Sequence, residues 1–90
     1  MAKVKKLFTT IKLSNGDSCD IYEITPLMIW ISQFRANQHK EDEVNNVPFI
    51  IEQAITINEK QITWREIGEM EYQDYVKIEE IIYRQMTPLF

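Results

Sequence analysis

Two predicted strands and a tight turn occupy the stretch Leu7-Phe8-Thr9-Thr10-Ile11-Lys12-Leu13, Ser14-Asn15-Gly16-Asp17 and Cys19-Asp20-Ile21-Tyr22-Glu23-Ile24. Apolar and β-branched residues alternate along the first segment, which is typical of a strand. Asn15-Gly16 supplies residues that adopt the positive φ angles of a hairpin turn. The stretch therefore predicts a β-hairpin over 7–24. Both of its faces are partly apolar, so the sequence leaves open which face is buried.

A helix is predicted to follow the hairpin without a linker. Thr25 is a good N-cap, and Pro26 suits the first helical position, where its missing N–H is not needed. The helix should run to about His39, with Leu27, Ile31 and Phe34 as its core stripe.

Three further helices are predicted along the rest of the chain, over 47–54, 64–68 and 72–86. Thr63 and Glu66 fit a capping box at the start of the short third helix. Between the second and third helices we expect a loop, with Ile57 and Ile62 extended on either side of a polar turn.

The last helix has the clearest periodicity. Its polar face is predicted to be Gln73, Lys77, Glu80 and Arg84, and its apolar face Tyr75, Ile78, Ile82 and Met86. The predicted fold class is therefore α+β, an N-terminal β-hairpin followed by a small bundle of three to four helices. We expect a single domain over 1–90, with a flexible basic N-terminus at 1–6, a helical part over 25–86 and a C-terminal tail at 87–90.

Composition limits the classes of partner. The net charge is −4 and the sequence pI is about 4.9, whereas a nucleic-acid-binding face needs a surplus of Lys and Arg. The longest apolar run, Leu27 to Ile31, is far shorter than the roughly 18 residues that a membrane span requires. We therefore expect no nucleic acid, no membrane and no signal peptide.

The sequence holds no recognisable catalytic or metal-binding motif. It has one cysteine, Cys19, and one histidine, His39, which is too few for a zinc site. The two glycines, Gly16 and Gly68, do not form a phosphate-binding loop. We expect no enzymatic activity, no cofactor and no metal, and a lone cysteine fits a reducing compartment.

Protein binding is the remaining interpretation. Met28, Ile29 and Trp30 extend the apolar stripe almost around the first helix. Core packing is the favoured role of Trp30, but Trp and Met are also enriched at interfaces, so an interface role stays open. The candidate partner-binding residues are Met28, Trp30, Phe34, Leu89 and Phe90.

Four short motifs resemble the tail assembly chaperones of long-tailed bacteriophages. They are the turn Leu13-Ser14-Asn15-Gly16-Asp17, the helix start Ile24-Thr25-Pro26-Leu27, the turn Ile57-Asn58-Glu59-Lys60-Gln61-Ile62-Thr63 and the step Met70-Glu71-Tyr72-Gln73-Asp74-Tyr75. The resemblance covers roughly residues 9–86. Glu59 stands where the family tends to have glycine, so the shape of the second turn is in doubt.

The resemblance implies a non-enzymatic helper in the cytoplasm of the bacterial host. It would bind the tape-measure protein, the tail-tube subunits or both during tail assembly, and it could form a homo-oligomer. Two alternatives stay open. One is a small acidic phage-encoded regulator that inhibits a host protein through Glu41-Asp42-Glu43 or Glu79-Glu80. The other is a structural subunit of the tail or baseplate.

Overall fold

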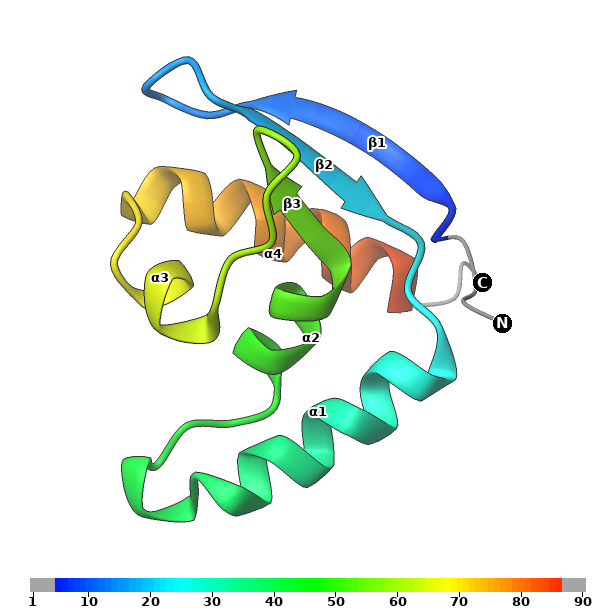
Figure 1. Cartoon of the computed structure of the whole chain (residues 1–90), viewed down its shortest axis with the longest axis vertical. Helices are drawn as coiled ribbons and strands as arrows, with labels where there is room; N and C mark the ends of the chain where they lie inside the picture. The colour runs from blue at the N-terminus through cyan, green and yellow to red at the C-terminus, as the bar shows by residue number, and fades with distance from the viewer. Residues whose placement is uncertain (1–4, 87–90) are drawn as a thin grey trace.

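The fold is described from a computed structural model, which describes residues 5–86 (Figure 1). Within them, the elements in chain order are β1 (Leu7–Lys12), β2 (Ser18–Tyr22), α1 (Pro26–Gln38), the 3-10 helix η1 (Lys40–Asp42), α2 (Val47–Ala54), β3 (Ile55–Ile57), α3 (Trp64–Gly68) and α4 (Tyr72–Met86). The predicted α+β class with an N-terminal hairpin is confirmed. The predicted tail at 87–90 lies outside the described residues.

The hairpin has the predicted turn. Gly16 adopts a φ of +92°, and the Leu13 N–H donates to the Asp17 carbonyl over 2.8 Å. The Asn15 side chain accepts from the Asp17 N–H, which closes the turn locally. In the antiparallel register Ile11 lies opposite Cys19, and a β-bulge interrupts the pairing between Leu7 and Thr9.

A third strand corrects the prediction of a loop after α2. β3 begins directly where α2 ends and pairs antiparallel with β2, so that the sheet order is β1-β2-β3. Three residues are too few to show a period of two, and the strand exists because β2 offers it a free edge. The turn that follows places both Asn58 and Glu59 at positive φ, +50° and +66°.

The core lies between the sheet, α2 and α4 (Figure 1). Its centre is apolar and fully buried, and it includes Cys19, Ile21, Ile51, Ile78 and Ile82. The buried face of the hairpin is therefore the one that carries Cys19 and Ile21. The polar face predicted for α4 is confirmed, since all four of its residues are exposed.

Two polar contacts join α4 to the hairpin. Asp74, buried in the first turn of α4, accepts from the backbone N–H of Ser14 at 3.0 Å and from its hydroxyl at 2.8 Å. Near the other end of α4, Gln85 accepts from the Ile24 N–H and donates to the Tyr22 carbonyl. These contacts join segments about 60 residues apart in the chain.

Candidate protein-interaction site

The inner face of α1, which packs against α2, combines apolar and polar residues. Ser32 is fully buried, and its hydroxyl donates to the Ile29 carbonyl at 2.6 Å and accepts from the Asn46 side chain at 3.3 Å. Met28, 7% exposed, is the only apolar residue of α1 that is classed as buried. The Ser32–Asn46 hydrogen bond therefore joins this face to the N-cap residue of α2, beside the apolar contact of Met28.

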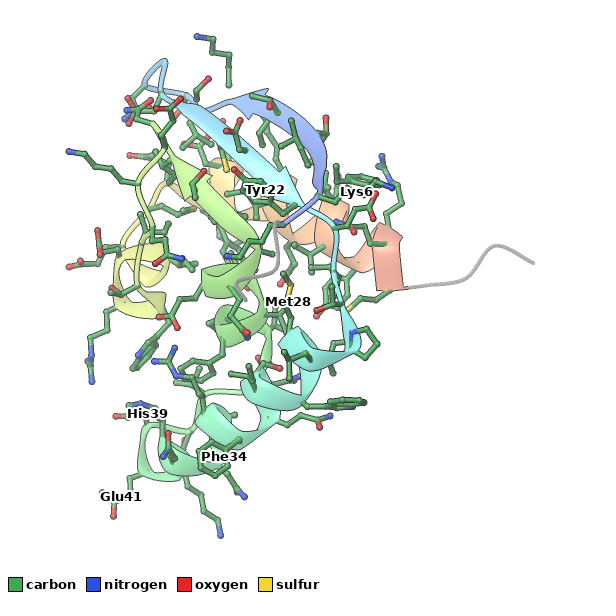
Figure 2. All side chains as sticks on the ribbon, turned by 45° about the vertical axis from the view of Figure 1, so that its right-hand side comes forward. Lys6, Tyr22, Met28, Phe34, His39 and Glu41 are labelled. Atoms are coloured by element: carbon green, nitrogen blue, oxygen red, sulfur yellow. The ribbon has the colours of Figure 1, made fainter. Side chains whose placement is uncertain are left out.

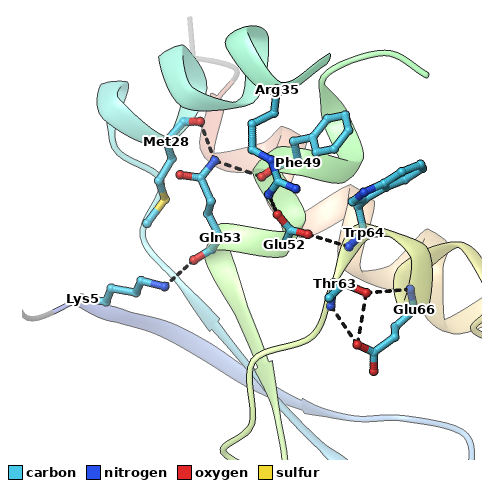
Figure 3. A network of polar contacts seen from close by, with 9 residues as sticks. All are labelled: Lys5, Met28, Arg35, Phe49, Glu52, Gln53, Thr63, Trp64 and Glu66. Atoms are coloured by element: carbon cyan, nitrogen blue, oxygen red, sulfur yellow. Dashed lines mark hydrogen bonds and ion pairs between the residues drawn. The ribbon is translucent and has the colours of Figure 1, made fainter. Parts of the chain in front are cut away.

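Two side chains of α2 complete this contact (Figure 3). Gln53 Nε2 donates to the Met28 carbonyl at 2.8 Å and to the Phe49 carbonyl at 2.9 Å. Glu52 forms an ion pair with Arg35 and also accepts from the Trp64 N–H at 2.7 Å. The network joins α1 and α2 to the start of α3.

The outer face of α1 is apolar and exposed. We call its four large apolar residues the outer stripe; they recur at helical spacings of three, one and three. Their exposed fractions are 54% for Leu27, 63% for Trp30, 39% for Ile31 and 65% for Phe34. Figure 2 shows Phe34 on α1 well away from Met28, which lies near the body of the molecule. The helix thus buries Ser32 beside Met28 and presents four large apolar side chains to water.

These positions correct two predictions. The expected core stripe of Leu27, Ile31 and Phe34 is wrong, because all three residues face solvent. The favoured core role of Trp30 is also wrong. The inner face is instead fixed by Glu52 of α2, which pairs with Arg35, and by Gln53, which donates to the Met28 backbone carbonyl.

Of the candidate partner-binding residues, Trp30 and Phe34 lie together on the outer stripe, whereas Met28 lies in the core cluster. Leu89 and Phe90 lie outside the described residues. Sequence reasoning missed Leu27 and Ile31 as surface residues. The available signal was Ser32 and Arg35, which share a helical face with Met28 and mark the polar side of the helix.

A groove borders the outer stripe between α1, the start of β1 and the segment before α3. Its volume is about 680 Å³, and its apolar walls are Leu27, Met28, Ile31 and Ile62. Lys5, Lys6, Glu23, Glu52 and Gln53 are among its polar lining residues. Leu27 and Ile31 belong to both the groove and the outer stripe, so the two form one continuous surface.

Charge is nearly absent from this helix. Arg35 is the only charged residue of α1, and Glu52 neutralises it. The chain as a whole is 27% charged. A partner that covers the outer stripe therefore displaces water from apolar and uncharged groups, which gives contacts that depend little on ionic strength.

Two potential nucleophiles, the Cys19 thiol and the Tyr75 hydroxyl, have raised pKa values. Burial, with smaller contributions from Asp20 and Asp74, raises the pKa of the Cys19 thiol to about 12. Burial and the hydrogen bond to Glu79 raise the pKa of Tyr75 well above its ordinary value. Both groups therefore stay protonated at neutral pH.

Within residues 5–86, no group of three or more His, Cys, Asp or Glu side chains could hold a metal ion. His39 instead packs against both Phe49 and Trp64, with ring centroids 5.5 and 5.0 Å away, and its Nδ1 lies 3.2 Å from a carboxylate oxygen of Asp42. The part of the chain that the structure describes has no helix both long and apolar enough to cross a membrane.

No family model, curated protein or solved structure matches this chain.

Proposed function

We propose that this chain is a non-enzymatic assembly chaperone that binds an apolar helical surface of a phage tail protein. The outer stripe of α1 carries the proposal. Four large apolar side chains in contact with water are unfavourable until a partner covers them, and such patches mark interaction sites in soluble proteins.

The shape of the site favours a helical partner. The stripe follows one face of α1 for about two turns, and the groove runs beside it. Helices bind grooves of this kind through apolar side chains at helical spacing. The proposed partners are the tape-measure protein and the tail-tube subunits in the host cytoplasm. The resemblance in the turns and helix starts implies these partners.

Binding should be tested with purified tape-measure and tail-tube proteins encoded by the same phage genome. Trp30→Ala should weaken binding by about 2 kcal/mol or more, roughly 30-fold, because exposed Trp residues often dominate interfaces. Tyr72→Ala is the matched control, since Tyr72 is an aromatic residue 77% exposed on another helix. Equal binding by the wild type and Trp30→Ala would contradict the proposal.

Ionic strength separates this function from the acidic-regulator alternative. The outer stripe is uncharged, so complex formation should persist at high salt. The acidic groups required by the alternative lie on different elements: Glu41 and Asp42 in η1, and Glu79 and Glu80 on α4. Loss of binding at high salt, with no effect of Trp30→Ala, would favour the regulator.

The free chain should also associate with itself weakly, because a second copy can cover the same stripe. Sedimentation at increasing protein concentration should reveal this association, and Trp30→Ala should reduce it.

A structural tail or baseplate subunit would bind similar proteins but would remain in the finished particle, where mass spectrometry would detect it.

A further inference from the structure

The groove beside the outer stripe has a basic end. Lys5 and Lys6 line it where β1 begins, close to the first turn of α1, which contributes Leu27 and Met28. Lys5 Nζ donates to the Gln53 carbonyl at 2.6 Å and lies 5.9 Å from the centroid of the Tyr22 ring. This contact fixes the ammonium group at the groove.

The charged residues that line the groove are Lys5, Lys6, Glu23 and Glu52, but one of the two glutamates is engaged by an arginine outside the groove. Glu52 is already paired with Arg35, which leaves Glu23 as the one other carboxylate among its lining residues. Two lysines therefore face one unmatched carboxylate, in a chain whose net charge is −4. Among residues 5–86, no carboxylate forms an ion pair with Lys6.

The start of α1 adds to this positive end. Its first turn contains no acidic residue, although acidic side chains stabilise helix N-termini by interacting with the helix dipole. Lys5, Lys6 and the N-terminus of α1 thus favour negative charge at the same end of the groove.

We infer that the groove binds an amphipathic helix that inserts apolar side chains between α1 and Ile62 and places Asp or Glu residues over Lys5 and Lys6. This inference rests on the proposed function and adds the chemistry of the bound segment and its direction along α1. Apolar contact with Leu27 and Ile31 provides the affinity. The acidic residues fix which end of the partner lies at the start of α1, since charge complementarity sets orientation more than affinity.

Two synthetic peptides test the inference. Both carry leucines at helical spacing in an alanine and glutamine background; one begins with two glutamates and the other with two glutamines. Binding is followed through the backbone amide resonances of the full chain at low salt. The glutamate peptide should bind roughly threefold to tenfold more tightly, as expected for two exposed ion pairs. The amides of Leu27, Ile31 and Ile62 should shift.

Two charge reversals locate the effect. Lys6→Glu should abolish the preference for the glutamate peptide. Lys12→Glu should retain it, because Lys12 is an exposed lysine at the far end of β1 that does not line the groove. Both variants change the net charge equally, so a general electrostatic effect would alter both.

The outcomes distinguish this inference from the proposed function. Equal affinity of the two peptides, or a preference that survives Lys6→Glu, overturns the inference. If Trp30→Ala still weakens binding of both peptides in that case, the proposed function stands. If neither peptide binds, or if both bind away from α1, the groove inference fails, whereas the proposed function is then judged by the purified tail proteins.

Discussion

Glu59 has a backbone conformation that usually favours glycine. Its φ is +66°, and the preceding Asn58 is also left-handed at +50°. The Cβ of either residue crowds the backbone there, but Asn tolerates this region better than Glu because its short polar side chain can hydrogen-bond locally. The resemblance placed glycine at this position of the turn, and the backbone here has the conformation that glycine would adopt.

Glu59→Gly should therefore stabilise the protein by about 0.5–1 kcal/mol, since relief of strain exceeds the entropy that glycine adds to the unfolded chain. Denaturant unfolding would measure the change. Glu59→Ala is the control, because alanine keeps the Cβ while removing the charge. If both variants stabilised equally, charge rather than backbone strain would be the cause.

The Cys19 thiol should resist modification in the folded protein. It is fully buried, and its pKa of about 12 leaves almost no thiolate at pH 8. A thiol reagent should react slowly with the native chain and rapidly in denaturant. The unfolded thiol ionises near its ordinary value of 9.0, so the folded state should lose stability as pH rises from about 9 to 12. Rapid modification of the native protein would contradict the buried placement.

At the scale of the element, α1 is held by polar contacts of its inner face. Gln53 supplies two hydrogen bonds, to the carbonyls of Met28 and Phe49. This arrangement leaves the outer stripe free for a partner, because the four residues of the stripe do not form the attachment of α1 to α2.

Gln53→Ala should consequently destabilise the fold by about 1–2 kcal/mol, because it removes two side-chain hydrogen bonds, one of which joins α2 to α1. Gln33→Ala, at an exposed position of α1, should change stability by less than about 0.5 kcal/mol. Thermal unfolding of the two variants provides the comparison. A Gln53→Ala variant as stable as the wild type would mean that the other contacts of the inner face hold α1 without the Gln53 side chain.

At the scale of the whole molecule, α4 connects to both ends of the hairpin. Its buried residues Ile78 and Ile82 pack in the core, while Asp74 and Gln85 bind the hairpin through hydrogen bonds. These contacts join α4 to the turn of the hairpin and to the end of β2.

Asp74→Ala should lower the free energy of unfolding by about 1–3 kcal/mol, since both donors of Ser14 lose their acceptor. Glu80→Ala removes the same charge from the exposed face of α4 and should have little effect. Chemical denaturation followed by circular dichroism would test this difference. Equal stability of the two variants would show that the Ser14 contact contributes nothing.

The sequence by itself determined the features that depend on neighbours along the chain. Gly16 closes the hairpin turn, Thr63 and Glu66 form the predicted capping box, and α4 has the predicted polar and apolar faces. These features follow from φ preferences, from hydrogen bonds three residues apart and from a strong helical period, all of which act within a few residues.

Only the tertiary structure decided which face of α1 is buried and that β3 is a strand. α1 carries two stripes at helical spacing, one apolar and one through Met28, Ser32 and Arg35. Hydrophobicity alone favours burying the apolar stripe, but Gln53 and Glu52 of α2 bind the polar one. β3 likewise exists because β2, more than 30 residues earlier, offers hydrogen-bonding groups at its edge. Such choices depend on contacts between distant segments, and they place the proposed interaction site on the surface.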